Sequence, residues 1–136
     1  MYLLDTNVIS ELRKPKPHGA VVAWIQSVPA YQVFMSAVTL GELQAGVELT
    51  RRQAPSKAAE IERWIDSIAE LYQVLPMDAA AFREWARLMH RRPGQMFQDA
   101  MIAATARVHG MTVVTRNERD FASFGVNLIN PFSSSV

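Results

Sequence analysis

The sequence predicts an α/β fold in which helices cover both faces of a mostly parallel sheet. Short apolar runs of strand length alternate with helix-like segments along the whole chain. The 136 residues match the length of one compact domain, and a hydrophobic fraction of 49% suffices for a buried core. Cysteine is absent, which excludes disulfide scaffolds and thiolate metal sites. We therefore expect a single domain over residues 1–136, with residues 131–136 as a tail.

The first half of the chain alternates between strand and helix patterns. A short apolar run ends at Asp5, and the next apolar side chains recur at helical spacing. Prolines and a glycine between positions 14 and 19 break that helix. The expected elements are a strand at 2–4, a helix carrying Val8, Ile9 and Leu12, a short helix at 20–26, a strand at 32–36 and a helix that opens at Thr39.

The second half begins with the clearest helix pattern in the chain. Apolar residues recur every three or four positions from Ile61 to Tyr72, and Ser56 precedes them as the expected N-cap. Asp78 is expected to cap the following helix, and Gly110 to end a helix at 97–109 that is apolar on almost every side. The remaining expected elements are a weak strand or connector at 74–75, strands at 112–115 and 126–129, and a polar turn at 116–121.

Charge and hydropathy favour a soluble cytoplasmic protein that binds a polyanion. No apolar run approaches the ~20 residues that cross a bilayer, and Asp5 stands where a signal peptide would carry basic residues. The chain has 14 Lys and Arg against 13 Asp and Glu, a net charge of +1. If four of the acids bind a metal, the rest of the surface carries about +5, which suits a polyanionic substrate.

Two carboxylates lie where carboxylates are costly or unusually placed. Asp5 directly follows an apolar strand, and ligand sites in parallel sheets form at the carboxyl ends of strands. The alternative is that Asp5 only caps the next helix. Asp99 lies in the first turn of the apolar helix at 97–109, where a buried charge must be paired or bind a metal. The alternative for Asp99 is a simple interaction with the positive helix N-terminus.

Two further carboxylates have equally ordinary alternatives. Thr39 and Glu42 fit the capping box, in which the Glu side chain reaches back to the amide of the cap residue. Asp120 closes the polar turn after the strand at 112–115, where a solvated loop acid is common. As a set, however, all four acids fall at the ends of elements that a parallel sheet brings to one edge. A cluster of carboxylates without Cys or suitably spaced His selects Mg²⁺ or Mn²⁺, and such clusters commonly serve phosphodiester hydrolysis.

Four segments of the chain form a recognisable series. They are Leu4 to Glu11 (LDTNVISE), Ser36 to Leu43 (SAVTLGEL), Asp99 to Ala106 (DAMIAATA) and Thr115 to Phe121 (TRNERDF). In this order they resemble the motifs of PIN-domain toxins of the VapC/FitB-like group, and the resemblance extends to the ending Asn130-Pro131. It implies an α/β/α domain with a central parallel sheet and a metal-dependent endoribonuclease, the toxin of a toxin–antitoxin pair. It also implies a homodimer and a cognate antitoxin that inserts a segment into the active site.

The resemblance assigns roles by position. Asp5, Glu42 and Asp99 would bind Mg²⁺ or Mn²⁺, and Asp120 would complete the site or hold a second ion, because position 117 is Asn. The polar residues that would line the site are Thr6, Asn7, Thr115 and Asn117, with helix capping as the alternative for Thr6 and Asn7. The basic residues on neighbouring turns that we expect to contact RNA are Arg91, Arg92, Arg116 and Arg119, with solvated loop charges as the alternative.

Two rival functions belong to other classes. An aspartyl-phosphate enzyme or receiver domain also places Asp after its first strand. A dehalogenase-like phosphatase, which belongs to the same class, would need a second acid at position 7, where this chain has Asn7. The receiver and phosphatase folds both need a lysine late in the chain, whereas the last lysine here is Lys57. A non-catalytic RNA-binding or regulatory module on the same fold is the second rival. The presence of all four acids argues against a site that has lost catalysis.

Overall fold

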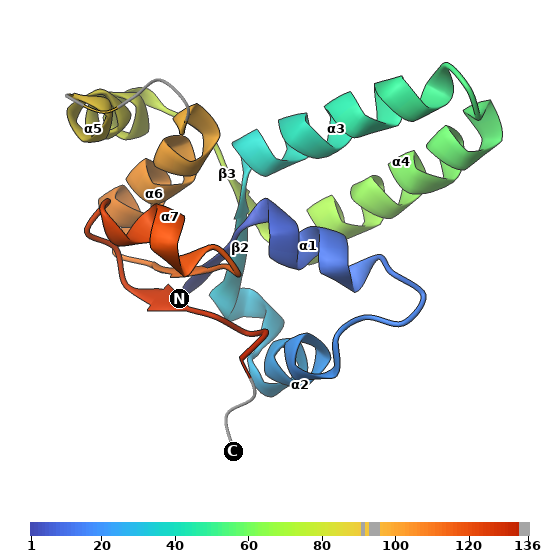
Figure 1. Cartoon of the computed structure of the whole chain (residues 1–136), viewed down its shortest axis with the longest axis horizontal. Helices are drawn as coiled ribbons and strands as arrows, with labels where there is room; N and C mark the ends of the chain where they lie inside the picture. The colour runs from blue at the N-terminus through green and yellow to red at the C-terminus, as the bar shows by residue number, and fades with distance from the viewer. Residues whose placement is uncertain (91, 93–95, 134–136) are drawn as a thin grey trace.

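The computed structural model describes residues 1–90, 92 and 96–133, which form an α/β fold around one five-stranded sheet (Figure 1). The strand order is β3-β2-β1-β4-β5, and every neighbouring pair is parallel. This arrangement confirms the predicted fold class. The strands are β1 (Tyr2–Leu4), β2 (Val33–Ser36), β3 (Gln73–Leu75), β4 (Thr112–Val114) and β5 (Leu128–Ile129).

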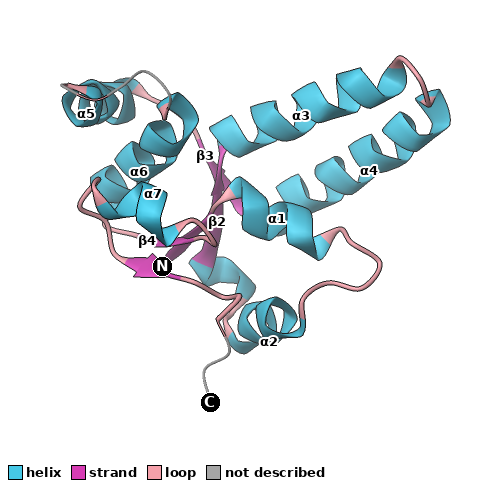
Figure 2. Ribbon diagram, in the orientation of Figure 1, coloured by secondary structure: helices cyan, strands magenta, loops and turns pink. Residues whose placement is uncertain are grey.

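Helices connect the strands and occupy most of the described chain (Figure 2). They are α1 (Thr6–Leu12), α2 (Gly19–Ser27), a 3-10 helix (Ala30–Gln32), α3 (Ala37–Arg51), α4 (Pro55–Leu71), α5 (Ala79–Met89), α6 (Phe97–His109) and α7 (Glu118–Ala122). Over the residues that the structure describes, no helix is both long and apolar enough to cross a membrane.

Two apolar layers fill the space between the sheet and its helices. Alternate residues of β1 face opposite layers, as a strand requires: Leu3 packs in the cluster under α5, α6 and α7, and Leu4 packs in the cluster under α1 and α2. The same alternation separates Val113 from Val114 in β4. Figure 1 shows α5, α6 and α7 on one side of the sheet and α1 to α4 on the other. The sheet therefore has helices on both faces.

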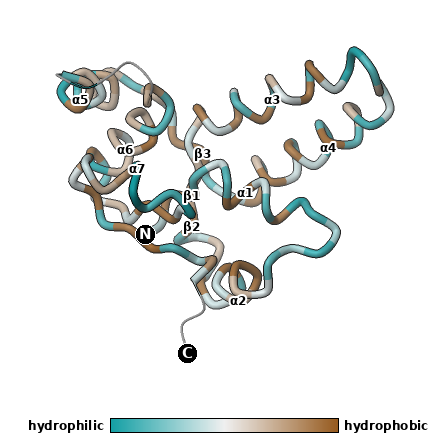
Figure 3. Tube along the Cα trace, in the orientation of Figure 1, coloured by the Kyte–Doolittle hydropathy of each residue, from teal (hydrophilic) through white to brown (hydrophobic). Residues whose placement is uncertain are grey.

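The α3–α4 hairpin extends beyond the sheet as an arm (Figure 1). Its outer part has a small core of its own, formed by Val47, Ala58 and Ile65. The tip is strongly hydrophilic, since Arg51 ends α3 and Arg52 and Gln53 form the turn that follows it (Figure 3). The base of this hairpin is the part that borders the sheet, because α3 begins directly after β2.

The strand order creates a switch point between β1 and β4. The chain passes from β1 outward to β2 and β3, and then returns to place β4 on the other side of β1. Leu4 pairs with Val114, and Asp5 N donates to the Val114 carbonyl at 2.9 Å, so the pairing continues one residue past β1. In open parallel sheets, ligands bind outside the carboxyl ends of strands at such a point.

Several predicted boundaries are confirmed. The helix at 97–109 has the predicted limits, and Gly110 follows it in the left-handed conformation (φ 66°), which a glycine adopts without strain. Asp78 caps α5, because its side chain accepts a hydrogen bond from Ala81 N at 2.9 Å. The first strand also has its predicted limits. These elements have strong local signals.

Three predictions are wrong. The helix expected to open at Thr39 begins at Ala37, and Ser36 is its cap, with its hydroxyl accepting from Val38 N at 3.0 Å. Ser56 does not cap α4, which begins at Pro55, a residue suited to the first helical turn because it lacks an N–H. The expected polar turn at 116–121 includes most of helix α7. Phe121 is fully buried there, and this burial stabilises a helix too short to persist alone.

Candidate functional site

Asp5 is the buried acid at the switch point, with a side chain that is only 4% exposed. Its Oδ1 accepts from Thr6 N at 2.8 Å, which caps α1, and its Oδ2 accepts from Thr115 Oγ1 at 2.7 Å. Burial raises the pKa of Asp5 against the lowering effect of these two bonds, and the charge of Asp120 raises it further. The two sequence interpretations of Asp5 therefore hold together: it caps a helix and also lies at the carboxyl end of a strand.

A chain of hydroxyls links Glu42 to the same place. The hydroxyls of Thr6 and Thr39 lie 3.0 Å apart, and Thr6 Oγ1 donates to Glu42 Oε1 at 3.1 Å. Because α3 starts two residues before Thr39, Thr39 and Glu42 are one turn apart on the same helix face, and the capping-box interpretation is wrong. Burial raises the pKa of Glu42, with a further contribution from Asp5.

Asp99 projects from the first turn of α6 and is half-buried. Burial raises its pKa to about 6, and the charges of Asp5, Asp120 and Glu42 add to the effect. A carboxylate at a helix N-terminus is normally favoured. Here the raised pKa indicates that desolvation and repulsion from like charges outweigh that benefit.

Asp120 is an exposed residue of α7, and it acts on both Asp5 and Asp99 as a neighbouring charge. The loop before α7 is bound to the site through Thr115, whose hydroxyl accepts from Asn117 N at 2.9 Å and from Asn7 Nδ2 at 3.4 Å. Three of the four polar positions expected to line the site, Asn7, Thr115 and Asn117, are thus linked by hydrogen bonds. We call Asp5, Glu42, Asp99 and Asp120 the carboxylate cluster.

The carboxylate cluster has no cationic partner in the parts of the chain that the structure describes. Within those same residues, no three His, Asp or Glu side chains converge tightly enough to enclose an ion. Negative charges without a cation between them repel one another, and this repulsion adds to the larger effect of burial in raising the pKa of Asp99. The structure thus brings the four predicted acids into one electrostatic neighbourhood without closing them around a common point.

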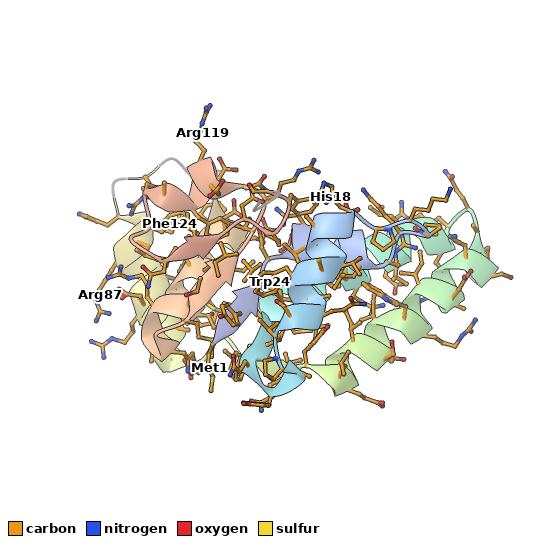
Figure 4. The ribbon with its side chains drawn as sticks, turned by 90° about the horizontal axis from the view of Figure 1, so that it is seen from below. Met1, His18, Trp24, Arg87, Arg119 and Phe124 are labelled. Atoms are coloured by element: carbon orange, nitrogen blue, oxygen red, sulfur yellow. The ribbon has the colours of Figure 1, made fainter. Side chains whose placement is uncertain are left out.

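The four arginines expected to contact RNA differ in their surroundings. Arg92 is engaged within the protein: its guanidinium donates to the carbonyls of Leu88 and Ser123 and lies over the ring of Phe124. Arg116 and Arg119 are exposed, and Figure 4 shows Arg119 extending away from the fold. Arg91 lies outside the described residues.

Sequence reasoning missed two residues beside this site. Thr39 was interpreted as a helix cap, whereas it is fully buried and contacts Thr6. Phe132 was assigned to a tail, whereas its ring packs against the core cluster under α1 and α2. For Thr39 the available signal was its spacing from Glu42, because residues three apart share a helix face.

Comparison with known proteins identifies the family. The family model of the PIN domain matches residues 2–127. The chain belongs to the PIN domain family. This PIN domain is 39% identical to Toxin FitB of Neisseria gonorrhoeae over 97% of the chain and 99% of that protein. It is 37% identical to VapC ribonuclease Y4jK of Sinorhizobium fredii over 97% and 98% of the two chains. These relatives show that it belongs to the VapC/FitB group, as the four motifs predicted.

A solved structure has the same fold along its full length. FitAB bound to a DNA fragment superposes on this PIN domain with a TM-score of 0.87 and 35% identity, covering 100% of this chain and 99% of that one. The likeness includes the segments that carry the carboxylate cluster, since essentially nothing of either chain is left unmatched.

Proposed function

We propose that this PIN domain is a Mg²⁺- or Mn²⁺-dependent endoribonuclease that hydrolyses RNA phosphodiesters as the toxin of a toxin–antitoxin pair. The observation that carries the proposal is the carboxylate cluster at the β1–β4 switch point, where burial first, and the neighbouring acids second, raise the pKa values of Asp5, Glu42 and Asp99. The names of the full-length relatives, a toxin and a ribonuclease, support the assignment.

The donor set fits a hard divalent cation. It consists of carboxylates, with hydroxyls behind them and neither Cys nor His among them, which suits Mg²⁺ or Mn²⁺. Asp5, Glu42 and Asp99 would hold the ion, and Asp120 would complete the site. Thr115 and Thr6 would orient Asp5 and Glu42, since each donates a hydrogen bond to one of these carboxylates.

The reaction is hydrolysis of one phosphodiester bond. The oxygen of a water molecule bonds to phosphorus while the bond from phosphorus to the 3′ oxygen breaks, which leaves a 5′-phosphate and a 3′-hydroxyl. The bound cation supplies positive charge that favours loss of the water proton and balances the charge developing on phosphate. Exposed Arg116 and Arg119 would bind phosphates on either side of the cut.

The proposed partners are RNA, a cognate antitoxin and a second copy of the chain. The antitoxin is supported by the relative named a toxin and by the solved structure named FitAB. Apolar side chains on α5 and α6 offer surface for a homodimer, because Phe82, Phe97 and Val108 are 45%, 46% and 40% exposed. The proposed location is the cytoplasm, where the RNA substrate is made.

The test is cleavage of a pool of transfer and ribosomal RNA by purified protein, with Mg²⁺, with Mn²⁺ and with EDTA. Asp99→Asn should reduce cleavage by about 10³-fold, because a catalytic cation contributes several kcal/mol. Asp66→Asn is the matched control, since Asp66 is an exposed acid on α4 and should leave cleavage unchanged. End mapping should find 5′-phosphates.

Two outcomes would contradict the proposal. If the wild type and Asp99→Asn cut RNA alike, the activity does not come from the carboxylate cluster. If Mn²⁺ does not raise the melting temperature of the wild type and no RNA in the pool is cut, the non-catalytic RNA-binding or regulatory interpretation replaces the endoribonuclease.

A further inference from the structure

The C-terminal segment packs against the loop that leads from β4 into α7. The guanidinium carbon of Arg116 lies 4.5 Å from the centroid of the Phe132 ring. This distance is within the range in which an aromatic face attracts a cation. The contact joins the residue that follows Thr115 to a residue beyond the last strand.

The backbone of Arg116 is fixed by the site itself. Arg116 N donates to Asn7 Oδ1 at 3.3 Å, and the preceding hydroxyl, Thr115 Oγ1, donates to Asp5 at 2.7 Å. Arg116 therefore begins directly beside the carboxylate cluster. Its backbone position does not determine where its long side chain points, because four side-chain torsions remain.

The Phe132 ring is held on several sides. Phe132 N donates to Asn130 Oδ1 at 3.0 Å, and Asn130 Nδ2 donates to Glu118 Oε2 at 3.1 Å, which ties the segment to α7. The ring also meets the His18 ring edge-to-face, with centroids 5.4 Å apart. Phe132 is thus a fixed surface against which the Arg116 side chain rests.

A second arginine–phenylalanine pair in the molecule shows what is particular about this one. Arg92 lies over Phe124 at 5.0 Å, but its guanidinium also donates to two backbone carbonyls, so its donors are used within the fold. Among the described residues, no acceptor takes a hydrogen bond from the guanidinium of Arg116. The Phe132 face orients that guanidinium and leaves its N–H groups available to an outside acceptor.

We infer that Phe132 is a positioning residue: its ring holds the guanidinium of Arg116, whose backbone is hydrogen-bonded beside the carboxylate cluster, in place to receive a phosphate of the RNA. The inference rests on the proposed function. A free arginine side chain loses rotamer freedom when it binds a phosphate, and a side chain already held loses less. The ring itself touches no substrate in this arrangement.

The experiment measures RNA binding in a protein that should not cleave the RNA probe. Every variant carries Asp99→Asn, and the probe is a short fluorescein-labelled single-stranded RNA of mixed sequence. Anisotropy titrations in Mg²⁺ are repeated over a series of KCl concentrations. The variants added to this parent are Arg116→Gln, Phe132→Leu, Phe132→Trp and the combination of Arg116→Gln with Phe132→Leu, and melting temperatures establish that each is folded.

Arg116→Gln should weaken binding and reduce the slope of log K against log salt by about 0.7 to 0.9, the value of one lost phosphate contact. Phe132→Leu keeps an apolar side chain but has no aromatic face, and it should weaken binding by about two- to five-fold. Phe132→Trp should restore affinity. In the Arg116→Gln protein, Phe132→Leu should have no further effect, because the cation that the ring holds is gone.

Arg119→Gln is the matched control, since Arg119 is an exposed arginine of the same region for which no contact with Phe132 is found. Phe132→Leu should weaken binding equally with and without Arg119→Gln. If Phe132→Leu weakens binding as much with Arg116→Gln as without it, or if Phe132→Trp fails like Phe132→Leu, the ring acts only structurally and the inference is overturned. If the parent binds no RNA at any salt concentration, the proposed function fails as well, which distinguishes the two failures.

Discussion

Two clusters of acidic side chains in this molecule have opposite electrostatic surroundings. On the α3–α4 hairpin, Gln44 Nε2 donates to one oxygen of Glu48 and one of Glu62, each at 2.7 Å, and Arg51 donates to both carboxylates at 3.0 to 3.2 Å. These hydrogen bonds lower the pKa of Glu48 and of Glu62. In the carboxylate cluster, burial and neighbouring acids instead raise the pKa of Asp99, of Glu42 and of Asp5.

The difference teaches that the same residue types are paired within the chain in one place and left without a cationic partner in the other, among the residues that the structure describes. The hairpin acids are paired within the chain, so they need nothing from solution. The negative charge of the carboxylate cluster is not balanced by a cation in the described chain, as the proposed cation site requires. Under the proposed function, the cluster lowers the stability of the fold until a cation binds, whereas the paired hairpin acids carry no such cost.

After the loss of cleavage in Asp99→Asn, the next largest effect is expected from the hydroxyl that donates to Asp5. Thr115→Val removes the donor to Asp5 Oδ2 and should lower metal-dependent RNA cleavage by about 10- to 100-fold, the usual effect of losing a group that orients a ligand. Cleavage rates against Mg²⁺ concentration measure it. Thr105→Val is the matched control, because Thr105 is equally buried but donates to Met101 O inside α6. An equal loss of activity in both variants would mean that Thr115 has no orienting role.

The second effect concerns stability without metal. Asp99→Asn removes a half-buried charge that is disfavoured by burial and also repelled by its neighbours, so in EDTA it should stabilise the fold by on the order of 1 kcal/mol after allowance for solvent screening. This corresponds to a melting temperature higher by about 3 to 5 °C. Mn²⁺ should then raise the melting temperature of the wild type more than that of the variant. A variant that melts below the wild type in EDTA would contradict the repulsion argument.

The third effect is on the pH dependence of that stability. The pKa of Asp99 is about 6 in the folded protein, above its ordinary value of 3.8, so the folded state binds the proton more tightly than the unfolded state. The penalty is complete above about pH 6 and is relieved as the pH falls towards about 4. In EDTA, the melting temperature of the wild type should therefore rise between about pH 7 and about pH 5.

The hairpin acids do not cancel this trend in that pH range. The pKa values of Glu48 and Glu62 lie below their ordinary value of 4.5, so the stability they contribute is present above that value and is lost only in more acidic solution. Asp99→Asn should flatten the rise. An unchanged slope in that variant would assign the pH dependence to other groups.

The smallest effect is expected on the hairpin. Glu62→Gln removes a charge from a half-exposed network with Arg51, and such exposed pairs contribute little. The melting temperature should change by less than about 2 °C, and RNA cleavage should not change. A large loss of cleavage would show that the hairpin network is coupled to the carboxylate cluster, which would end the contrast between the two regions.

The predictable parts of the fold are those with local causes. The limits of α6 followed from its apolar composition and from Gly110, and the cap of α5 followed from Asp78. The four carboxylates were also predictable as a set, because the carboxyl ends of parallel strands meet at one edge. The family followed from the order of four motifs, which is a property of the chain alone.

The mispredicted parts depend on contacts between distant segments. The pattern of Thr39 and Glu42 fits a helix cap equally well, and only the position of Ser36 after β2 decided where α3 begins. The segment that forms α7 has the polar sequence of a turn. Its helix is stabilised by the burial of Phe121 against residues distant in the chain, and the local sequence does not show that contact.

The sequence by itself determined the fold class, the strong helices and the family, and it predicted that the four acids lie at one edge of the sheet. The tertiary structure alone decided that Thr115 holds Asp5, that Thr6 joins Thr39 to Glu42, and that Phe132 lies against Arg116. The physical reason is the separation along the chain of the residues that interact. Helix caps and apolar spacing act over a few residues, whereas the hydrogen bond from Thr115 to Asp5 spans 110 residues and exists only once β1 and β4 are neighbours.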